Sequence, residues 1–432
     1  MAEPATDVFV QIDGEDVFAG RLWSHRRRGA ESATFAYAEE YLARPDAYAL
    51  DPALPPASGQ HHTRVAQPLF GAFGDCAPDR WGRRLINRAQ RRARGERGTG
   101  RTLSEIDYLL GVRDDLRQGA LRFRASGGQV FLAPEDSGVP PLLELGRLLD
   151  ASARLERDEE SDEDLRLLLR GGSSLGGARP KAHVIDPRGR AAIAKFPSVS
   201  GDEWDVVAWE AVVHELARRA GLDVPQAELH RIDGKPILIV ERFDRDGSRR
   251  IGYASAMTML EAGDREPRSY LEIADVIERA SPTATRDLRE LWSRIAFSIL
   301  VSNTDDHLRN HGLLKTSTAG WQLAPAFDIN PNPRAGPDQF ATPIDDENRR
   351  TIELLLDVAD YFRLGDQDAR SILARVRQAT SQWRQVAQDF GLGRDAVQAM
   401  APAFEHQQAA ATPAKPARSE PAVRRARRAP GP

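Results

Sequence analysis

The stretch from Asn303 to Asn310 contains two adjacent aspartates, a histidine and two asparagines. Carboxylate and amide oxygens are hard ligands that suit Mg²⁺, and a carboxylate can also orient a hydroxyl and accept its proton. Asp305 is five residues before Asn310, and Asp306 is four residues before it. We predict that this stretch supports phosphoryl transfer, with one aspartate acting on the attacking hydroxyl and Asn310 holding a metal ion.

A later aspartate, Asp328, follows Asn310 by eighteen residues and comes after the strand-like residues 321–323. In protein kinases, the catalytic aspartate and the metal-binding asparagine are five residues apart on one loop. A later aspartate there chelates the metal that bridges the phosphates. This spacing favours Asp305 over Asp306 as the catalytic base and predicts Asn310 and Asp328 as the Mg²⁺ ligands.

Residues 171–181, with the sequence GGSSLGGARPK, include Gly176, Gly177 and Lys181. Glycines let backbone N–H groups approach phosphate oxygens, and a nearby lysine could neutralise those oxygens. The stretch is not a Walker A loop, because no lysine directly follows its glycines. A flexible surface loop is the alternative interpretation of this stretch.

Lys195 lies fourteen residues beyond Lys181, in the apolar run AAIAKF. A glycine loop followed by a strand that ends in a lysine is the arrangement in which a kinase lysine reaches the α- and β-phosphates of ATP. Such a lysine needs a carboxylate on a nearby helix. Glu210 is the first candidate for this partner and Glu215 the second.

Two other interpretations of the aspartate stretch remain open. Asp and Asn are also common in helix caps and turns. His307 and His311, at i and i+4, could hold zinc or iron together with Asp305 or Asp306. That site would need a third strong ligand, and it would leave the glycines and Lys195 unexplained.

The elements that must position these residues follow from periodicity and turn signals. In the first third we expect a hairpin over residues 8–22 around Asp13-Gly14 and a helix over 78–94. A second helix over 103–111 begins behind Thr102 as N-cap, and a surface helix pair covers 141–170. Short strand-like runs then fill residues 182–243, interrupted by one helix over 206–220, and the chain from Tyr253 to about Phe404 is mostly helical.

We therefore predict an α+β fold with a bilobal, protein-kinase-like arrangement, in which a strand-rich lobe precedes a helical lobe. The predicted units are an N-terminal α+β domain over 1–128, a strand-rich lobe with the glycine loop over 140–252, a helical lobe over 253–408 and a disordered basic tail over 409–432.

Composition fits a globular protein of the cytoplasm. Apolar residues make up 41% of the chain and Cys76 is its only cysteine, which excludes an internal disulfide and a thiolate metal cage. No apolar run approaches the roughly 20 residues that span a bilayer, and the first residues lack a signal-peptide pattern. Arginines crowd residues 83–101 and acids crowd residues 156–164, which indicates either a partner or DNA surface or solvated faces.

Several separated stretches resemble the HipA family, the serine/threonine kinase toxins of bacterial type II toxin–antitoxin systems. The resemblance covers about residues 5–400. The matching stretches are GSSLGGARPK (172–181), VERFDR (240–245), NTDDHLRNHG (303–312) and APAFD (324–328), with FGAFGD (70–75), PDRWGR (78–83), DYLL (107–110) and GALRF (119–123) upstream.

The resemblance implies a role for each matching residue. Ser174, with Ser173 as the adjacent alternative, matches the serine whose autophosphorylation silences the kinase. Asp305 matches the catalytic base, and Asn310 and Asp328 match the Mg²⁺ ligands. The implied ATP contacts are Ser174, Gly176, Gly177, Lys181, Lys195, Glu241, Phe243, His307, Asn310 and Asp328, with Glu241 and Phe243 at the hinge that holds adenine.

The implied partners are a helix-turn-helix antitoxin, operator DNA bound through that antitoxin, and a protein substrate in translation such as an aminoacyl-tRNA synthetase. Two other functional classes stay open. One is a small-molecule phosphotransferase of kinase-like fold, which would not require Ser174 or an N-terminal domain. The other is a non-enzymatic regulator bound to antitoxin or DNA, in which the arginines of residues 83–101 make the contacts.

Overall fold

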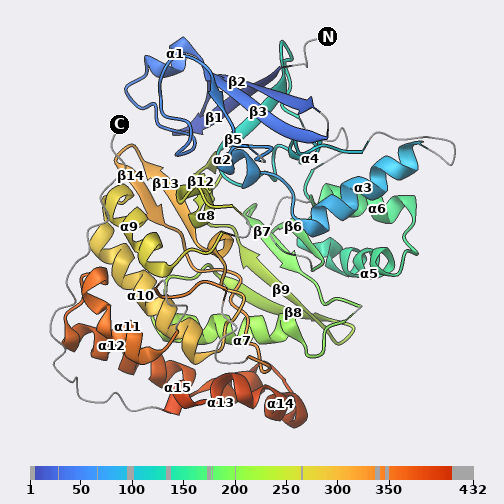
Figure 1. Cartoon of the computed structure of the whole chain (residues 1–432). Helices are drawn as coiled ribbons and strands as arrows, with labels where there is room; N and C mark the ends of the chain where they lie inside the picture. Colours follow the sequence, from blue (N-terminus) through green and yellow to red (C-terminus); the bar gives the residue numbers. More distant parts are fainter. Residues whose placement is uncertain are drawn as a thin grey trace.

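The computed structural model of the chain describes residues 5–27, 29–65, 67–94, 102–132, 138–172, 177, 179–199, 201–263, 266–335, 341–345 and 350–410. Ser173, Ser174 and Gly176 of the glycine-rich stretch lie outside the described residues, as does the tail from residue 411. The described part folds into antiparallel sheets and helices, so the α+β prediction is confirmed (Figure 1).

A five-stranded antiparallel sheet opens the chain, with its strands in the order β4-β3-β2-β1-β5. The strands are β1 (Thr6–Ile12), β2 (Glu15–Arg27), β3 (Ala30–Tyr37), β4 (His61–His62) and β5 (Leu121–Ala125). Asp13 and Gly14 form the turn between β1 and β2 with φ values of 49° and 88°. Two successive positive φ values are typical of a tight hairpin turn, and the predicted hairpin is confirmed.

Four helices accompany this sheet: α1 (Glu39–Leu42), α2 (Gly71–Gly74), α3 (Arg80–Arg94) and α4 (Glu105–Leu110). Helices are thus present within the predicted ranges 78–94 and 103–111, but the prediction of Thr102 as N-cap is wrong. Ser104 is the N-cap of α4, and its backbone N–H donates to Asp107 Oδ2 at 2.8 Å. We call β1–β5 with α1–α4 the N-terminal module.

A helix pair follows, as predicted for residues 141–170. It consists of the short 3-10 helix η1 (Leu142–Glu144), α5 (Leu145–Glu156) and α6 (Asp162–Arg170). Leucines of both helices pack in one core with Trp81 and Leu85 of α3. The pair therefore joins the N-terminal module to the sheet that comes next.

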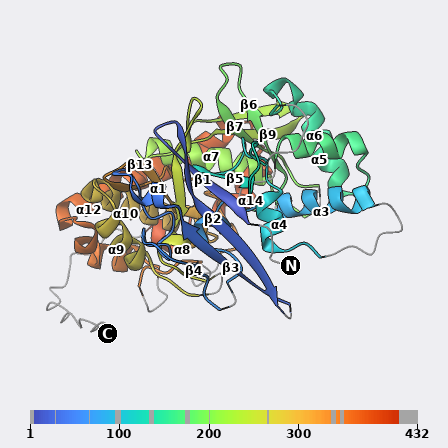
Figure 2. The same cartoon turned by 90° about the horizontal axis from the view of Figure 1, so that it is seen from above.

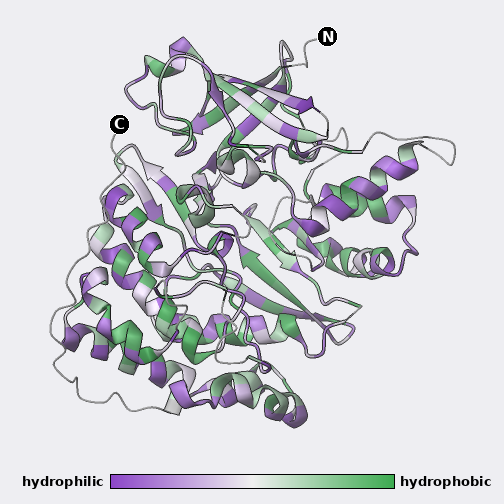
Figure 3. Ribbon diagram, in the orientation of Figure 1, coloured by the Kyte–Doolittle hydropathy of each residue, from purple (hydrophilic) through white to green (hydrophobic). Residues whose placement is uncertain are grey.

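The next sheet has four antiparallel strands in the order β6-β7-β9-β8. They are β6 (Lys181–Ile185), β7 (Ala191–Lys195), β8 (Ala227–Ile232) and β9 (Lys235–Glu241). The helix α7 (Val206–Arg219) packs Val207 and Ala211 against Leu238 and Val240 of β9. Figure 3 shows β9 as hydrophobic along most of its length, as expected of a strand buried on both faces. We call β6–β9 with α7 the strand lobe.

Two small sheets follow. The sequence did not predict β12, the first strand of the second sheet. Their strands are β10 (Arg245–Asp246) and β11 (Arg249–Arg250) in one, and β12 (Gly252–Ser255), β13 (Gly312–Ser317) and β14 (Gly320–Leu323) in the other. The strands β13 and β14 stand on either side of a short turn, between the Asp305–Asn310 loop and Asp328. They therefore fix where the two candidate stretches sit relative to each other.

The remaining elements form the helical lobe predicted after Tyr253. They are α8 (Ala256–Met259), α9 (Tyr270–Ala280), α10 (Ala284–Leu300), η2 (Leu308–Asn310), α11 (Ile352–Asp357), η3 (Ala359–Phe362), α12 (Asp366–Thr380), α13 (Trp383–Asp389), α14 (Arg394–Phe404) and α15 (Gln407–Ala410). The largest core of the molecule surrounds α10, whose Leu291, Trp292 and Phe297 are fully buried. A helix held this tightly is a rigid support for the loop that leaves its end.

The N-terminal module lies over the junction of the two lobes. Seen from above, β1 and β2 lie between α9, α10 and α12 on one side and β6, β7, α5 and α6 on the other (Figure 2). Among the described residues, no helix combines the length and apolar character needed to cross a bilayer.

Candidate active site

The loop after α10 presents its two aspartates in different environments. Asp305 is exposed and its neighbour Asp306 is 5% exposed. Ser302, at the start of the loop, has a φ of 51°, which turns the chain sharply away from the helix. This turn allows one aspartate to face outward while the next points into the core.

Both the carboxylate and the backbone carbonyl of Asp306 have bonding partners. The Tyr270 hydroxyl and the Ser298 hydroxyl donate to Oδ2, the latter at 3.1 Å, and Nε2 of His311 lies 3.0 Å from Oδ1. The Thr342 hydroxyl donates to the Asp306 carbonyl at 2.7 Å. Burial would raise the pKa of Asp306, but His311 and these hydrogen bonds hold it well below its usual range. Asp306 therefore anchors the loop and is not available to a substrate.

Asp305 keeps its carboxylate at the surface of the site. Partial burial raises the pKa of Asp305, nearby His307 lowers it, and the charges of Asp328 and Asp306 raise it further. Asn310 Nδ2 donates to the Asp305 carbonyl at 3.0 Å, so the two ends of the five-residue spacing are hydrogen-bonded to each other.

Lys195 ends β7 and meets two carboxylates. Its ammonium donates to Glu210 of α7 and to Asp328 Oδ1, the latter at 2.9 Å. Burial would lower the pKa of Lys195, but Asp328 and Glu210 raise it well above the usual value. Glu215, the second candidate partner in the sequence, instead binds Arg218 and Arg219 at 2.7 Å each. The helix thus directs Glu210 to Lys195 and leaves Glu215 with two arginines of its own last turn.

Asp328 lies 133 residues after Lys195 in the chain and is brought next to it by the fold. Its backbone has a φ of 58°, a left-handed conformation that is uncommon outside glycine and is often kept at functional positions. Burial would raise the pKa of Asp328, but the nearby lysines, Lys195 first, lower it to about 2. The carboxylate is therefore ionised at neutral pH.

Lys181 begins β6 beside the glycine-rich stretch, and its ammonium lies 3.0 Å from Asp79 Oδ2 of the N-terminal module. Gly177 of the glycine-rich stretch is close to this ammonium, since a Cβ atom on Gly177 would stand 2.9 Å from Lys181 Nζ. Sequence reasoning does not single out Asp79 within the PDRWGR stretch, because its partner Lys181 lies 102 residues away.

The residues expected around adenine lie at the end of β9. Glu241 donates its backbone N–H to Gln226 at 2.8 Å and binds Arg190 through its carboxylate at 2.9 Å. The ring of Phe243 lies 5.4 Å from that of Phe327, the residue before Asp328. Within the described residues, the buried Nδ1 of His307 has no hydrogen-bond partner.

The donors of the site fit Mg²⁺. Asp328 supplies an ionised carboxylate, and the amide oxygen of Asn310 is left for a cation because its Nδ2 is engaged with Asp305. Zinc or iron fits less well. His311 is bound to Asp306, and no three His, Cys, Asp or Glu side chains form a metal cage in the described part of the chain.

Several arginines of α3 are paired within the chain. Arg88 binds Asp158, and Arg92 lies 3.2 Å from Glu160 and 2.5 Å from Asp162. The acidic stretch of residues 156–164 is thus the partner of this helix face. Arg91 is exposed, and Arg94, Arg97 and Arg101 have side chains outside the described ones.

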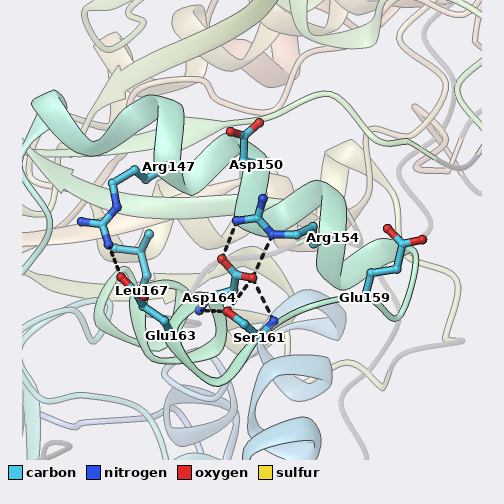
Figure 4. A pocket seen from close by; sticks show the side chains of 8 residues that line it. All are labelled: Arg147, Asp150, Arg154, Glu159, Ser161, Glu163, Asp164 and Leu167. Atoms are coloured by element: carbon cyan, nitrogen blue, oxygen red, sulfur yellow. Dashed lines mark hydrogen bonds and ion pairs between the residues drawn. The ribbon is translucent and has the colours of Figure 1, made fainter.

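A surface hollow of about 340 Å³ lies over α5 and α6 and does not include any of the candidate residues (Figure 4). Four of its six charged side chains bind each other: Arg154 Nη2 is 2.5 Å from Asp164 Oδ1, and Arg147 is 2.8 Å from Glu163. A hollow lined by satisfied ion pairs offers few unpaired groups to a ligand, so the candidate site remains the one between the lobes.

Several known proteins are similar to this chain. Two proteins of Sinorhizobium fredii strain NGR234 are similar in sequence. "Putative kinase Y4mE" is 24% identical over 68% of this chain and 71% of its own length, and "Putative kinase Y4dM" is 30% identical over 28% and 32%. The chain also resembles HipA in the solved complex of Shewanella oneidensis HipA, HipB and operator DNA. The TM-score is 0.66 at 16% identity, over 92% of this chain and 95% of that one.

The structural likeness confirms the bilobal kinase-like fold. Residues 173–383, which contain Lys195, Asp305, Asn310 and Asp328, match the family described as the HipA-like C-terminal domain. The chain thus has the fold of HipA and carries a HipA-like C-terminal domain, and its similar proteins in Sinorhizobium fredii are named as putative kinases.

Proposed function

We propose that the chain is a serine/threonine protein kinase that transfers the γ-phosphate of ATP to a protein hydroxyl, with Asp305 as the base. The observation that carries the proposal is the meeting of Lys195 and Asp328 at 2.9 Å, next to a loop that exposes Asp305 and buries Asp306. One lysine, one ionised carboxylate and one exposed aspartate are the groups that ATP-dependent phosphoryl transfer requires.

Each residue has a distinct role in this proposal. Lys195, oriented by Glu210, binds the α- and β-phosphates, while Asn310 and Asp328 hold Mg²⁺, which neutralises charge on the phosphates. Asp305 orients the acceptor hydroxyl and takes its proton. The raised pKa of Asp305 suits this role, because a base whose pKa is closer to neutral accepts a proton more readily. Phe243 and the backbone near Glu241 hold the adenine.

We further propose that this kinase is the toxin of a type II toxin–antitoxin system. Its partners would be a helix-turn-helix antitoxin and, through it, operator DNA; its substrate would be a protein of translation such as an aminoacyl-tRNA synthetase. Autophosphorylation at Ser174, or at the adjacent Ser173, would silence it, because a phosphate of nearly −2 charge is repelled by bound ATP phosphates. The HipA, HipB and operator complex of the structural relative supports this context.

The test compares wild type with Asp305→Ala, both purified and in cells. The purified variant should lose at least about 10²-fold of γ-phosphate transfer and keep its ATP binding, because Asp305 contacts the hydroxyl and not the nucleotide. After brief expression, phosphoproteomics should find new phosphoserine or phosphothreonine on a translation protein, and phosphate within residues 173–174, with wild type only.

Glu215→Ala is the matched control, since it removes a carboxylate from α7 that does not contact Lys195, and its transfer rate should equal that of wild type. Undiminished transfer by Asp305→Ala would refute the assignment of the base. Transfer to a small molecule and not to any protein would favour the phosphotransferase alternative.

A further inference from the structure

Two lysines lie side by side at the edge of the candidate site. Lys181 and Lys195 are directly opposite each other in the β6–β7 pairing, so their side chains are on the same face of the sheet. Each ammonium meets a carboxylate from another element. Lys195 binds Glu210 of α7, and Lys181 lies 3.0 Å from Asp79, which precedes α3 in the N-terminal module.

Asp79 is itself held in place by the helix that it begins. Its Oδ1 accepts from the backbone N–H of Gly82 at 2.8 Å, which caps the first turn of α3, and its Oδ2 faces Lys181. Trp81, on the same turn, donates Nε1–H to the backbone carbonyl of Lys181 at 3.0 Å. The first turn of α3 therefore binds both the side chain and the main chain of Lys181.

The ion pair lies in a largely buried place. The side chains of Lys181 and Asp79 are 11% and 8% exposed. Burial raises the pKa of Asp79, and the Lys181 charge opposes this effect. An ammonium that is removed from water needs a nearby opposite charge. The carboxylate of Asp79 supplies this charge and so stabilises the Lys181 side chain in its position next to Gly177.

We infer that Asp79 is a positioning residue that the N-terminal module contributes to the phosphate-binding site: it holds Lys181 for the phosphates of ATP as Glu210 holds Lys195. The inference rests on the proposed function, since it takes a nucleoside triphosphate as the ligand that Lys181 meets. An ammonium carries three donors, so a bond to one carboxylate oxygen is compatible with a bond to a phosphate.

The arrangement makes the N-terminal module part of the nucleotide site. Lys181 is within the electrostatic reach of Asp328, whose pKa it helps to lower, and Asp79 is close enough for Asp328 to raise its pKa. A shift of α3 relative to the strand lobe would thus move a phosphate-binding lysine. Binding of a partner to the module would change ATP affinity by the same route.

The test is Asp79→Asn, which keeps an oxygen to cap α3 and removes the charge that holds Lys181. ATP with Mg²⁺ should bind this variant about tenfold more weakly by calorimetry. The KM for ATP should rise by a similar factor while kcat changes by less than about threefold. In a Lys181→Ala background, Asp79→Asn should cause no further loss of affinity, because the two residues act as one unit.

Glu105→Gln is the matched control. It removes the same charge from the N-terminal module and breaks the Glu105–Arg83 pair of 2.6 Å, but it should leave ATP affinity unchanged. If Asp79→Asn reduces the folded fraction, Asp79→Ser replaces it, because serine also caps a helix and has no charge.

Equal or tighter ATP binding by folded Asp79→Asn would overturn the inference and leave the proposed function intact; tighter binding would mean that the carboxylate competes with phosphate. Failure of the wild-type chain and of Glu105→Gln to bind ATP with Mg²⁺ would overturn the proposed function, and this inference with it.

Discussion

At the scale of single residues, two adjacent aspartates have opposite tasks. Asp305 is exposed, and Asp306 is buried and bound by Tyr270, Ser298 and His311. The same side chain thus serves as a candidate base at one position and as an anchor at the next. The five-residue spacing to Asn310 favoured Asp305 from the sequence, and the burial of Asp306 gives the physical reason why it cannot substitute.

We expect Asp306→Asn to lower the free energy of unfolding at pH 7 by about 2 kcal/mol, because it removes the charge that accepts hydrogen bonds from Tyr270 and Ser298 and faces His311. The folded-state pKa of Asp306 is lowered, so its stabilisation is present above the unfolded pKa of about 3.9 and is lost as the pH falls through the folded value. Urea unfolding of the wild-type protein and of Asp306→Asn at pH 7 and at pH 3 measures this difference in the free energy of unfolding.

Asp305→Asn is the control for this change. It should unfold like the wild-type protein at neutral pH and yet lose phosphate transfer. Equal stability of Asp306→Asn and wild type would show that the buried hydrogen bonds do not anchor the loop.

At the scale of elements, α3 and the acidic stretch of residues 156–164 form one unit. Arg88 and Arg92 approach Glu160, whose side chain is only 3% exposed, at 3.6 and 3.2 Å. The sequence left open whether this helix face is a partner or DNA surface or a solvated face, and in the structure it is largely neutralised within the molecule. We accordingly expect DNA to be reached through the antitoxin and not through α3.

We expect Arg88→Ala with Arg92→Ala to destabilise the protein by about 1–3 kcal/mol, because the buried carboxylate of Glu160 would lose its cations. Hydrogen–deuterium exchange should become faster in α3 and α6. Arg91→Ala on the exposed side of α3 should change neither property, and equal protection in both variants would contradict the pairing.

At the scale of the whole molecule, the N-terminal module holds the segment beside the adenine region. Arg242, between Glu241 and Phe243, donates to the Leu116 carbonyl at 2.8 Å and to Asp244 at 2.7 Å. Asp244 in turn accepts from the backbone N–H of Gly119 at 2.8 Å. The module thus contacts the strand lobe at Lys181 and the segment that joins the lobes at Arg242.

We expect Asp244→Asn to lower the free energy of unfolding by about 3–5 kcal/mol, because it leaves the buried guanidinium groups of Arg242 and Arg245 without their shared carboxylate. Urea unfolding measures the change. Asp246→Asn, on an exposed residue two positions away, is the control and should unfold like wild type; a similar loss in both would show that the buried network is not the cause.

Much of the candidate site could be predicted because it depends on the spacing of residues along the chain. The two lobes and the partnership of Lys195 with Glu210 followed from local patterns and were found in the structure, while the choice of Asp305 as the base stays a prediction. The N-cap at Thr102 was wrong and β12 was missed, since a strand of four residues is too short to show a clear period. The domain boundaries near 128, 140, 252 and 408 stay predictions.

The sequence by itself determined the elements and the loop chemistry, because helix and strand periods and the five-residue spacing are local properties. Only the tertiary structure decided which charges meet. Asp79 reaches Lys181 across 102 residues, and the arginines of α3 reach the acids of residues 156–164. Ion pairs between distant segments depend on how the elements pack, and a charge in the sequence does not indicate which opposite charge the fold will place beside it.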